Sequence, residues 1–146
     1  MRTMIEMLGA AGLLAAPMAG AETPLAIKAT DPALKWGPCP PVFSGACEIA
    51  VLHGDPAKPN ADVLLRVGAD HALLPHTHSS AERMILVSGQ LRVLYRGAKP
   101  ATLSPGDYAY GPAGAPHEAR CLGDMPCTLF IAFEGPVDAL AFAGKL

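Results

Sequence analysis

The sequence predicts an all-β fold, a small antiparallel barrel or sandwich built from two sheets. The 146-residue chain contains 15 glycines and 15 prolines, about a fifth of its length, and these residues weaken or break helices. Short apolar runs alternate with turn signals at close spacing, without the strand–helix rhythm of a parallel sheet. Hydrophobic residues make up 51% of the chain and charged residues only 16%, so there is enough apolar surface to form a core.

The expected strands follow one another with few residues between them. Ser88-Gly89-Gln90 predicts a tight hairpin, and Pro105-Gly106 has the residue pair that a type II turn needs at its centre. One short helix is expected within residues 137–145. The expected strands are residues 48–53, 63–67, 83–87, 91–95, 101–103, 108–110, 117–121 and 128–133.

Residues 1–21 predict a secretory signal peptide that is cleaved. Arg2 supplies positive charge, residues 7–16 form an apolar core, and Ala19-Gly20-Ala21 is an A-x-A cleavage site. Because Glu6 is an acid where such segments are usually basic, the alternative is an N-terminal helix packed on the domain. Export predicts a periplasmic or secreted protein with no membrane span after cleavage.

The mature chain is expected to be one domain. Residues 22–60 would form an N-terminal arm and the first strands, and residues 61–146 the barrel. The net charge is −2 and no two basic residues are adjacent, so nucleic acid and anionic membrane surfaces are disfavoured as partners. Few charged residues lie between positions 91 and 133, which favours a small, largely apolar pocket and a small organic ligand.

The four cysteines form two local pairs. Cys39 and Cys47 flank a loop that contains proline and glycine, and Cys121 and Cys127 flank a hairpin connection. Three pairings are possible, and in an oxidising compartment the local disulfides Cys39–Cys47 and Cys121–Cys127 are the natural choice. A zinc site of four thiolates is the alternative, although no C-x-x-C pair is present. Cys121 shares strand parity with His117, so as a free thiol it would be a soft ligand or a nucleophile instead.

Four ligand-type side chains occur in two spaced motifs. His76-Thr77-His78 is followed by Glu82, and positions 76, 78 and 82 share parity on an extended chain. A second motif brings the chain back to His117 through turns at Gly106, Pro112 and Gly114. Imidazoles with a carboxylate suit a divalent transition metal, and four protein ligands leave open positions for substrate, water or O₂.

These motifs resemble those of the cupin superfamily. Gly-x5-Pro-x-Gly-x2-His and His-x-His-x3-Glu-x6-Gly both occur with the family's spacing, and the resemblance covers residues 62–133. It implies a barrel of the cupin or jelly-roll type, often a homodimer, with one divalent ion (Fe, Mn, Ni, Cu or Zn). The ligands that it implies are His76, His78, Glu82 and His117.

The sequence departs from the family pattern at two positions, and it shows a further, looser similarity outside residues 62–133. Asp70 stands where the family usually has glycine, and Cys121 stands where it usually has asparagine. Residues 36–59 and 135–139 are also similar, more loosely, to small exported cupins of unassigned role. A cupin fold whose site holds no metal is the alternative to a metal centre.

Two classes of function fit these observations. The first is a metalloenzyme that acts on a small organic molecule, with a metal-dependent dioxygenase ranked ahead of an isomerase or a lyase. The second is a non-catalytic, metal-dependent protein of the cell envelope that binds or senses a small molecule. His53 and His71 lie outside both motifs and are expected to be ordinary surface or loop residues. Candidate substrate contacts are Arg66, Arg83, Tyr95, Tyr108 and Tyr110.

Overall fold

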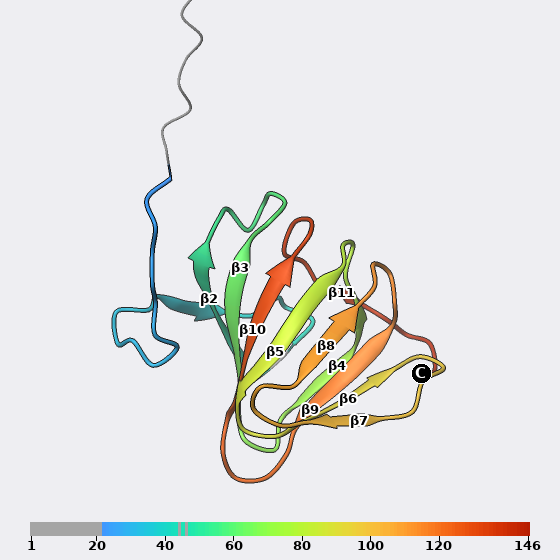
Figure 1. The fold of residues 1–146 in the computed structure, drawn as a ribbon. Coiled ribbons are helices and arrows are strands. Elements are labelled where there is room, and N and C mark those ends of the chain that lie inside the picture. The colour runs from blue at the N-terminus through green and yellow to red at the C-terminus, as the bar shows by residue number, and fades with distance from the viewer. Residues whose placement is uncertain (1–21, 44, 46) are drawn as a thin grey trace, which may run out of the picture.

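Two antiparallel sheets pack face to face in a computed structural model that describes residues 22–43, 45 and 47–146 (Figure 1). The larger sheet has the order β1 (Trp36–Pro38), β2 (Cys47–His53), β3 (Asp62–Val67), β10 (Cys127–Phe133), β5 (Glu82–Ser88), β8 (Tyr108–Gly111). The smaller sheet has the order β11 (Leu140–Ala141), β4 (Ala72–Thr77), β9 (His117–Cys121), β6 (Leu91–Tyr95), β7 (Ala101–Leu103). The predicted all-β, double-sheet fold is confirmed, with the two sheets kept separate at their edges.

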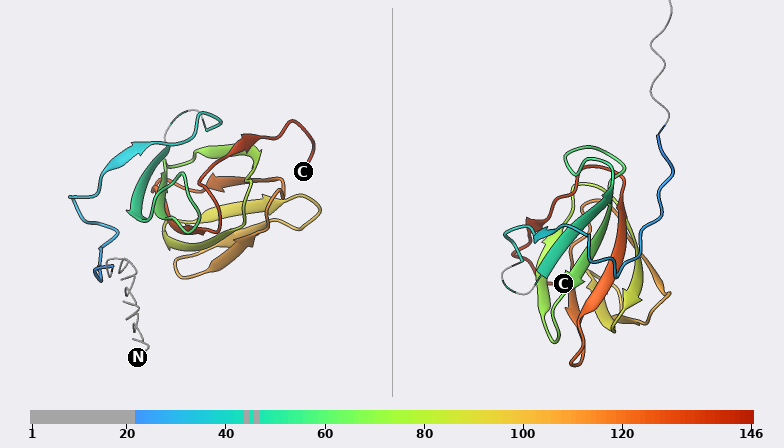
Figure 2. Two further views of the ribbon diagram at one scale, coloured as in Figure 1. Left: turned by 90° about the horizontal axis from the view of Figure 1, so that it is seen from above. Right: turned by 90° about the vertical axis from the view of Figure 1, so that its left-hand side faces the viewer.

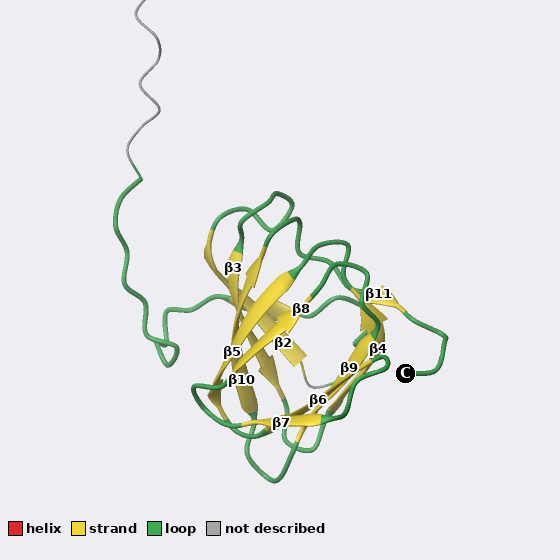
Figure 3. Ribbon diagram, turned by 45° about the vertical axis from the view of Figure 1, so that its right-hand side comes forward, coloured by secondary structure: helices red, strands yellow, loops and turns green. Residues whose placement is uncertain are grey.

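The described part of the chain consists of strands and loops (Figure 3). It therefore contains no helix that is long and apolar enough to cross a membrane. Residues 22–35 run outside the two sheets (Figure 2). The signal peptide expected at residues 1–21 lies outside the described residues.

The prediction of a helix within residues 137–145 is wrong. Residues 137–142 belong instead to the crossing segment, residues 134–142, which passes from the end of β10 in the larger sheet through β11 in the smaller one. The Val137 N–H donates to the carbonyl of Pro56, and the Phe142 N–H donates to the carbonyl of Pro75. Because these amides bond to distant parts of the chain, they do not form the local bonds of a helix.

Strand β4 was not among the expected strands, although it carries one of the candidate ligands. Pro75 lies inside it, and a proline cannot donate a hydrogen bond to a neighbouring strand. The pairing of β4 with β9 accordingly shifts register between Leu73 and His76. The proline concealed the strand pattern in the sequence, whereas pairing on both sides holds β4 in the sheet.

The core lies between the two sheets and follows strand alternation. In β10, Leu129, Ile131 and Phe133 are all at most 5% exposed, and the residues between them face the other side. Leu129 pairs with Leu65 of β3 and with Leu86 of β5, so three strands contribute to one buried layer. Because every second side chain points outward, strand alternation determines which of the candidate substrate contacts reach the interior.

Both local disulfides are present. They join Cys39 to Cys47 and Cys121 to Cys127, with Cα–Cα distances of 5.6 Å in each case. The Cys121–Cys127 bond closes the hairpin between β9 and β10, and both of its residues are fully buried. The chain's four cysteines are thus all bonded, which leaves no thiolate for a zinc site and no free Cys121 thiol.

Gly89, in the turn between β5 and β6, is expected to be sensitive to any side chain. It has a positive φ of 84°, and a Cβ atom there would lie 2.8 Å from the Pro126 carbonyl oxygen and 2.9 Å from Cys127 Cα. Gly97→Ala is the control, because Gly97 has a φ of 76° but nothing within 4 Å of a Cβ atom. Gly97→Ala should cost about 1–2 kcal/mol of unfolding free energy from backbone strain, and Gly89→Ala about 1–3 kcal/mol more from overpacking. Urea denaturation with the disulfides intact measures both, and equal losses would contradict the close packing at Gly89.

Candidate metal centre

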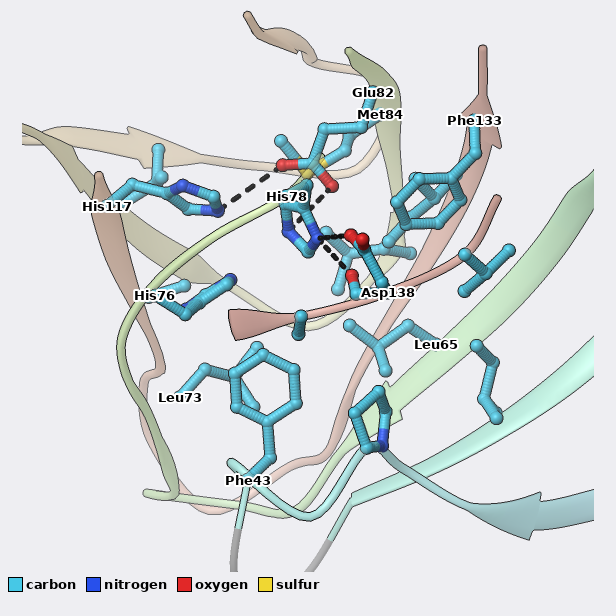
Figure 4. A pocket seen from close by; sticks show the side chains of 18 of the residues that line it. Phe43, Leu65, Leu73, His76, His78, Glu82, Met84, His117, Phe133 and Asp138 are labelled. Atoms are coloured by element: carbon cyan, nitrogen blue, oxygen red, sulfur yellow. Dashed lines mark hydrogen bonds and ion pairs between the residues drawn. The ribbon is translucent and has the colours of Figure 1, made fainter. Parts of the chain in front are cut away.

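The two sequence motifs meet at one end of the space between the sheets (Figure 4). His76 on β4 and His117 at the start of β9 are cross-strand partners in the smaller sheet. Glu82 begins β5 in the larger sheet, and His78 lies in the connection just after β4. All four side chains are buried, with exposed fractions between 2% and 8%. The structure therefore brings together every ligand candidate that the motifs contain.

The three imidazoles form a tight cluster with the carboxylate against two of them. One ring nitrogen from each of His76, His78 and His117 lies within 4.8 Å of the others, a grouping that could hold a metal ion. Glu82 Oε1 is 3.3 Å from His117 Nε2, and Glu82 Oε2 is 3.4 Å from His78 Nε2. The carboxylate thus lies between His78 and His117.

Backbone carbonyl groups orient each imidazole in the same way. His76 Nδ1 donates to the carbonyl of Leu74 at 2.7 Å, and His117 Nδ1 donates to that of Ala115 at 3.0 Å. His78 Nδ1 donates to the carbonyl of Asp138, a residue of the crossing segment. Because a carbonyl can only accept, each Nδ1 carries a proton and the lone pair of a neutral ring is on Nε2.

The donor set fits a divalent transition metal. In their neutral forms His78 and His117 present the Nε2 lone pair to the two oxygens of Glu82, and a cation between them would stabilise this arrangement. Glu82 Oε1 is buried without a hydrogen-bond partner, and an unpaired buried carboxylate is costly. Three imidazole nitrogens with one carboxylate, each imidazole held through its second nitrogen, are what such an ion binds.

His76 is held in the neutral form that a metal ligand needs. Burial first, then the neighbouring His117, and to a lesser extent His78, lower the pKa of His76 to about 3, against an opposite effect of the hydrogen bond to the Leu74 carbonyl. At neutral pH the ring therefore carries no proton on Nε2, and a metal ion does not have to displace one.

An apolar cavity extends from the histidine cluster into the barrel. Its volume is about 40 Å³, room for a few water molecules or a similarly small group of a ligand. Aliphatic and aromatic side chains from both sheets form most of its wall, including Leu65, Leu73 and Phe133. Outside the histidine cluster, Glu82 and Asp138 are the charged side chains among the described residues that line it, and both are acidic. The small apolar pocket expected from the sequence is present.

Three residues at the site were not singled out from the sequence. The Phe43 ring packs edge-on against His76, with ring centroids 4.5 Å apart, and lines the cavity. Asp138 orients His78 through its carbonyl, and its Oδ1 accepts from the Ser79 N–H at 2.9 Å. Gly111 is the cross-strand partner of Glu82. The loose similarity to small exported cupins was the only signal for Phe43, within residues 36–59, and for Asp138, within residues 135–139. Gly111 had no such signal.

Most of the candidate substrate contacts face away from the cavity. Inward-facing Leu65 and Met84 line it, so strand alternation sends Arg66 and Arg83 to the outer face. Arg66 lies over the Trp36 ring at 3.8 Å, and Arg83 pairs with Glu134.

The three tyrosines also lie outside the cavity lining. Tyr108 and Tyr110 on β8 are 57% and 47% exposed. Tyr95 is half-buried and stacks on His117, with ring centroids 4.9 Å apart. Burial, and then the negative charge of Glu82, raise the pKa of Tyr95, so its hydroxyl keeps its proton. A ligand in the cavity would therefore not meet Tyr108 or Tyr110, and Tyr95 is behind the histidine cluster rather than in the cavity wall.

The backbone conformation at Asp70 explains why the cupin pattern has glycine at this position. Its φ is +53°, in the left-handed region that glycine favours and aspartate tolerates. The Arg120 guanidinium donates to Asp70 Oδ1 at 2.7 Å, an exposed contact that holds the aspartate in place. The substitution changes a turn and leaves the ligand cluster intact.

Comparison with known proteins gives one family and several similar folds. The family described as "Cupin domain" matches residues 62–133, the span that contains both motifs. Dimethylsulfoniopropionate lyase DddQ of Ruegeria pomeroyi is 30% identical over 63 residues, which are 43% of this chain and 31% of that protein. The chain thus matches about a third of the length of this curated relative.

Three solved structures show the same fold at low sequence identity. The crystal structure of DddQ from Ruegeria pomeroyi has a TM-score of 0.66 at 20% identity, covering 77% of this chain and 64% of that one. KdgF from Halomonas sp. has a TM-score of 0.55 at 20% identity, covering 68% and 86%. Oxalate decarboxylase of Bacillus subtilis, a protein with Mn(II) centres, has a TM-score of 0.57 at 19% identity, covering 66% and 28%.

The depressed pKa of His76 predicts an acid-sensitive fold in the metal-free protein. Between pH 6.5 and about pH 3 the unfolded chain binds a proton at this residue and the folded chain does not. The free energy of unfolding therefore decreases as the pH is lowered through this range. His76→Gln removes this contribution and should make the slope shallower by up to about 1.4 kcal/mol per pH unit. Urea denaturation in the presence of a chelator, from pH 7 to pH 4, measures the slopes. His53→Gln, at a 44% exposed side chain, is the control and should keep the wild-type slope.

Proposed function

Since the chain belongs to the cupin superfamily, we propose that it is a metal-dependent lyase acting on a small organic molecule in the apolar cavity. One observation carries this proposal: three imidazole nitrogens within 4.8 Å of one another, beside a buried, unpaired carboxylate, at the end of a small cavity. His76, His78, Glu82 and His117 are the proposed ligands.

The cavity favours a substrate that carries its own positive charge. Its walls hold no lysine or arginine among the described residues, so a substrate carboxylate finds no basic side chain there. A bound divalent metal ion supplies that partner, as a Lewis acid that stabilises negative charge on the substrate. The acidic group of Asp138 suits a cationic sulfonium or ammonium group, and the apolar walls suit its methyl groups. A sulfonio carboxylic acid, the class of compound that the name of the DddQ lyase contains, meets all three conditions.

Elimination from such a substrate needs one proton acceptor. Asp138 lines the cavity and is not one of the four proposed ligands, so its carboxylate is the group that we assign to this role. The proton on carbon 2 moves to Asp138, the C–S bond at carbon 3 breaks with its electron pair going to sulfur, and a double bond forms between the two carbons. A dialkyl sulfide and an unsaturated acid leave, and no oxidant is consumed.

Export remains part of the proposal. Two disulfide bonds support it, because such bonds persist in oxidising compartments. Mass spectrometry of protein recovered from the cell envelope should show a chain that begins at Glu22 and has no free thiol. A chain that retains Met1 with four alkylatable cysteines would contradict export.

Replacing proposed ligands should remove the metal. His76→Ala and His117→Ala each delete an imidazole from the cluster and should reduce bound metal to less than about a tenth, and Glu82→Gln should weaken binding by roughly tenfold or more. Elemental analysis after reconstitution with Mn²⁺, Fe²⁺ or Zn²⁺ measures the loss, and circular dichroism checks the fold. His53→Ala is the matched control at an exposed histidine. Full metal content in the His76 and His117 variants would refute the ligand assignment.

Turnover of dimethylsulfoniopropionate distinguishes the lyase from the other candidates. The metal-loaded protein should release dimethyl sulfide without O₂, detected by gas chromatography in anaerobic buffer. Asp138→Asn should lower turnover by about 100-fold or more while the metal content stays unchanged.

Two other outcomes would favour the alternatives. Consumption of O₂ with a phenol or diketone, and no elimination under anaerobic conditions, would indicate a dioxygenase. A tightly bound ligand recovered unchanged would indicate the non-catalytic binding protein.

A further inference from the structure

Two buried oxygen atoms beside His117 have no hydrogen-bond partner among the described residues. They are the hydroxyl oxygen of Tyr95 and Oε1 of Glu82. One can donate a hydrogen bond and the other can only accept. Since nearly all buried polar groups in folded proteins are paired, two complementary ones without partners at the same place require an explanation.

The strand pairings bring these two oxygens to one point. Tyr95 on β6 lies opposite His117 on β9, and its ring stacks on the imidazole at an interplanar angle of 30°. Glu82 on β5 lies opposite Gly111 on β8. A Cβ atom on Gly111 would be 2.8 Å from Glu82 Oε1 and 3.1 Å from the Tyr95 hydroxyl oxygen. Both oxygens therefore flank the backbone of Gly111, where a rotation of the carboxylate or one bridging water joins them.

We propose that Tyr95 is the positioning residue of Glu82: its hydroxyl donates a hydrogen bond to Oε1, directly or through one ordered water. This bond selects one orientation of the carboxylate, in which Oε1 is 3.3 Å from His117 Nε2 and Oε2 is 3.4 Å from His78 Nε2, so both oxygens stay against the cluster. Gly111 is part of the same arrangement, because any side chain there would occupy the place of the carboxylate. The inference deepens the proposed function, since it rests on Glu82 as a ligand for its effect on metal affinity.

The test removes only the hydroxyl. Tyr95→Phe keeps the ring that stacks on His117, and Tyr108→Phe is the same change at a 57% exposed tyrosine. In the metal-free protein, Tyr95→Phe should lower the midpoint of thermal unfolding by roughly 3–10 °C, because the carboxylate loses its donor. With Glu82→Gln already in place, the same change should cost clearly less, so the double-mutant cycle should show coupling. Tyr108→Phe should leave the midpoint unchanged.

A second measurement follows the metal. Binding of Co²⁺, detected by its visible absorption, should weaken by roughly 10–100-fold in Tyr95→Phe and be unchanged in Tyr108→Phe. Gly111→Ala should weaken binding at least as much by displacing the carboxylate. Gly37→Ala is its control, because a Cβ atom at Gly37 meets only one atom, at 4.0 Å.

The two proposals fail in different ways. If Tyr95→Phe is as stable as the wild type or more stable, and the cycle shows no coupling, then the hydroxyl does not hold Glu82 and the inference is overturned. If the wild-type protein binds none of the metals, the proposed function fails, and the metal-free cycle still decides whether Tyr95 positions Glu82.

Discussion

The structure depends on a carboxylate buried in an apolar barrel. Glu82 is 2% exposed, and it begins a strand whose following inward residues, Met84 and Leu86, belong to the hydrophobic core. An ionised carboxylate in such a place costs several kcal/mol unless cations or donors surround it. The imidazoles of His78 and His117 are arranged around this charge, so the chemistry of the site follows from the cost of burying it.

The orientation of the imidazoles comes from the main chain rather than from other side chains. For His76 and His117 the acceptor is a carbonyl two residues earlier on the same segment. For His78 the acceptor is Asp138, sixty residues later. The crossing segment therefore both covers the cavity and orients a proposed ligand, which couples closure of this end of the barrel to the geometry of the cluster.

The similar folds come from proteins whose names denote different chemistry, a dimethylsulfoniopropionate lyase and an oxalate decarboxylase among them. The fold alone therefore does not select a reaction, and the cavity is the more informative feature. It is small, its wall is largely apolar, and the charged residues in that wall beyond the histidine cluster are acidic. These properties disfavour polymers and polyanions as ligands. A negatively charged group of a ligand would be bound by a cation at the histidine cluster.

The fold class, both disulfide pairs and the four proposed ligands could be predicted from the amino-acid sequence. Each of these depends on local information: turn residues between short apolar runs, cysteines a few residues apart, and strand parity that places positions 76, 78 and 82 on one face. The tertiary structure alone decided that Asp138 and Phe43 line the cavity, that Gly111 and Tyr95 meet behind Glu82, and that Arg66 faces outward. Those outcomes depend on strand register and on contacts between segments far apart in the chain. A local pattern does not contain them, because register is set only when the two sheets pack and their buried groups find partners.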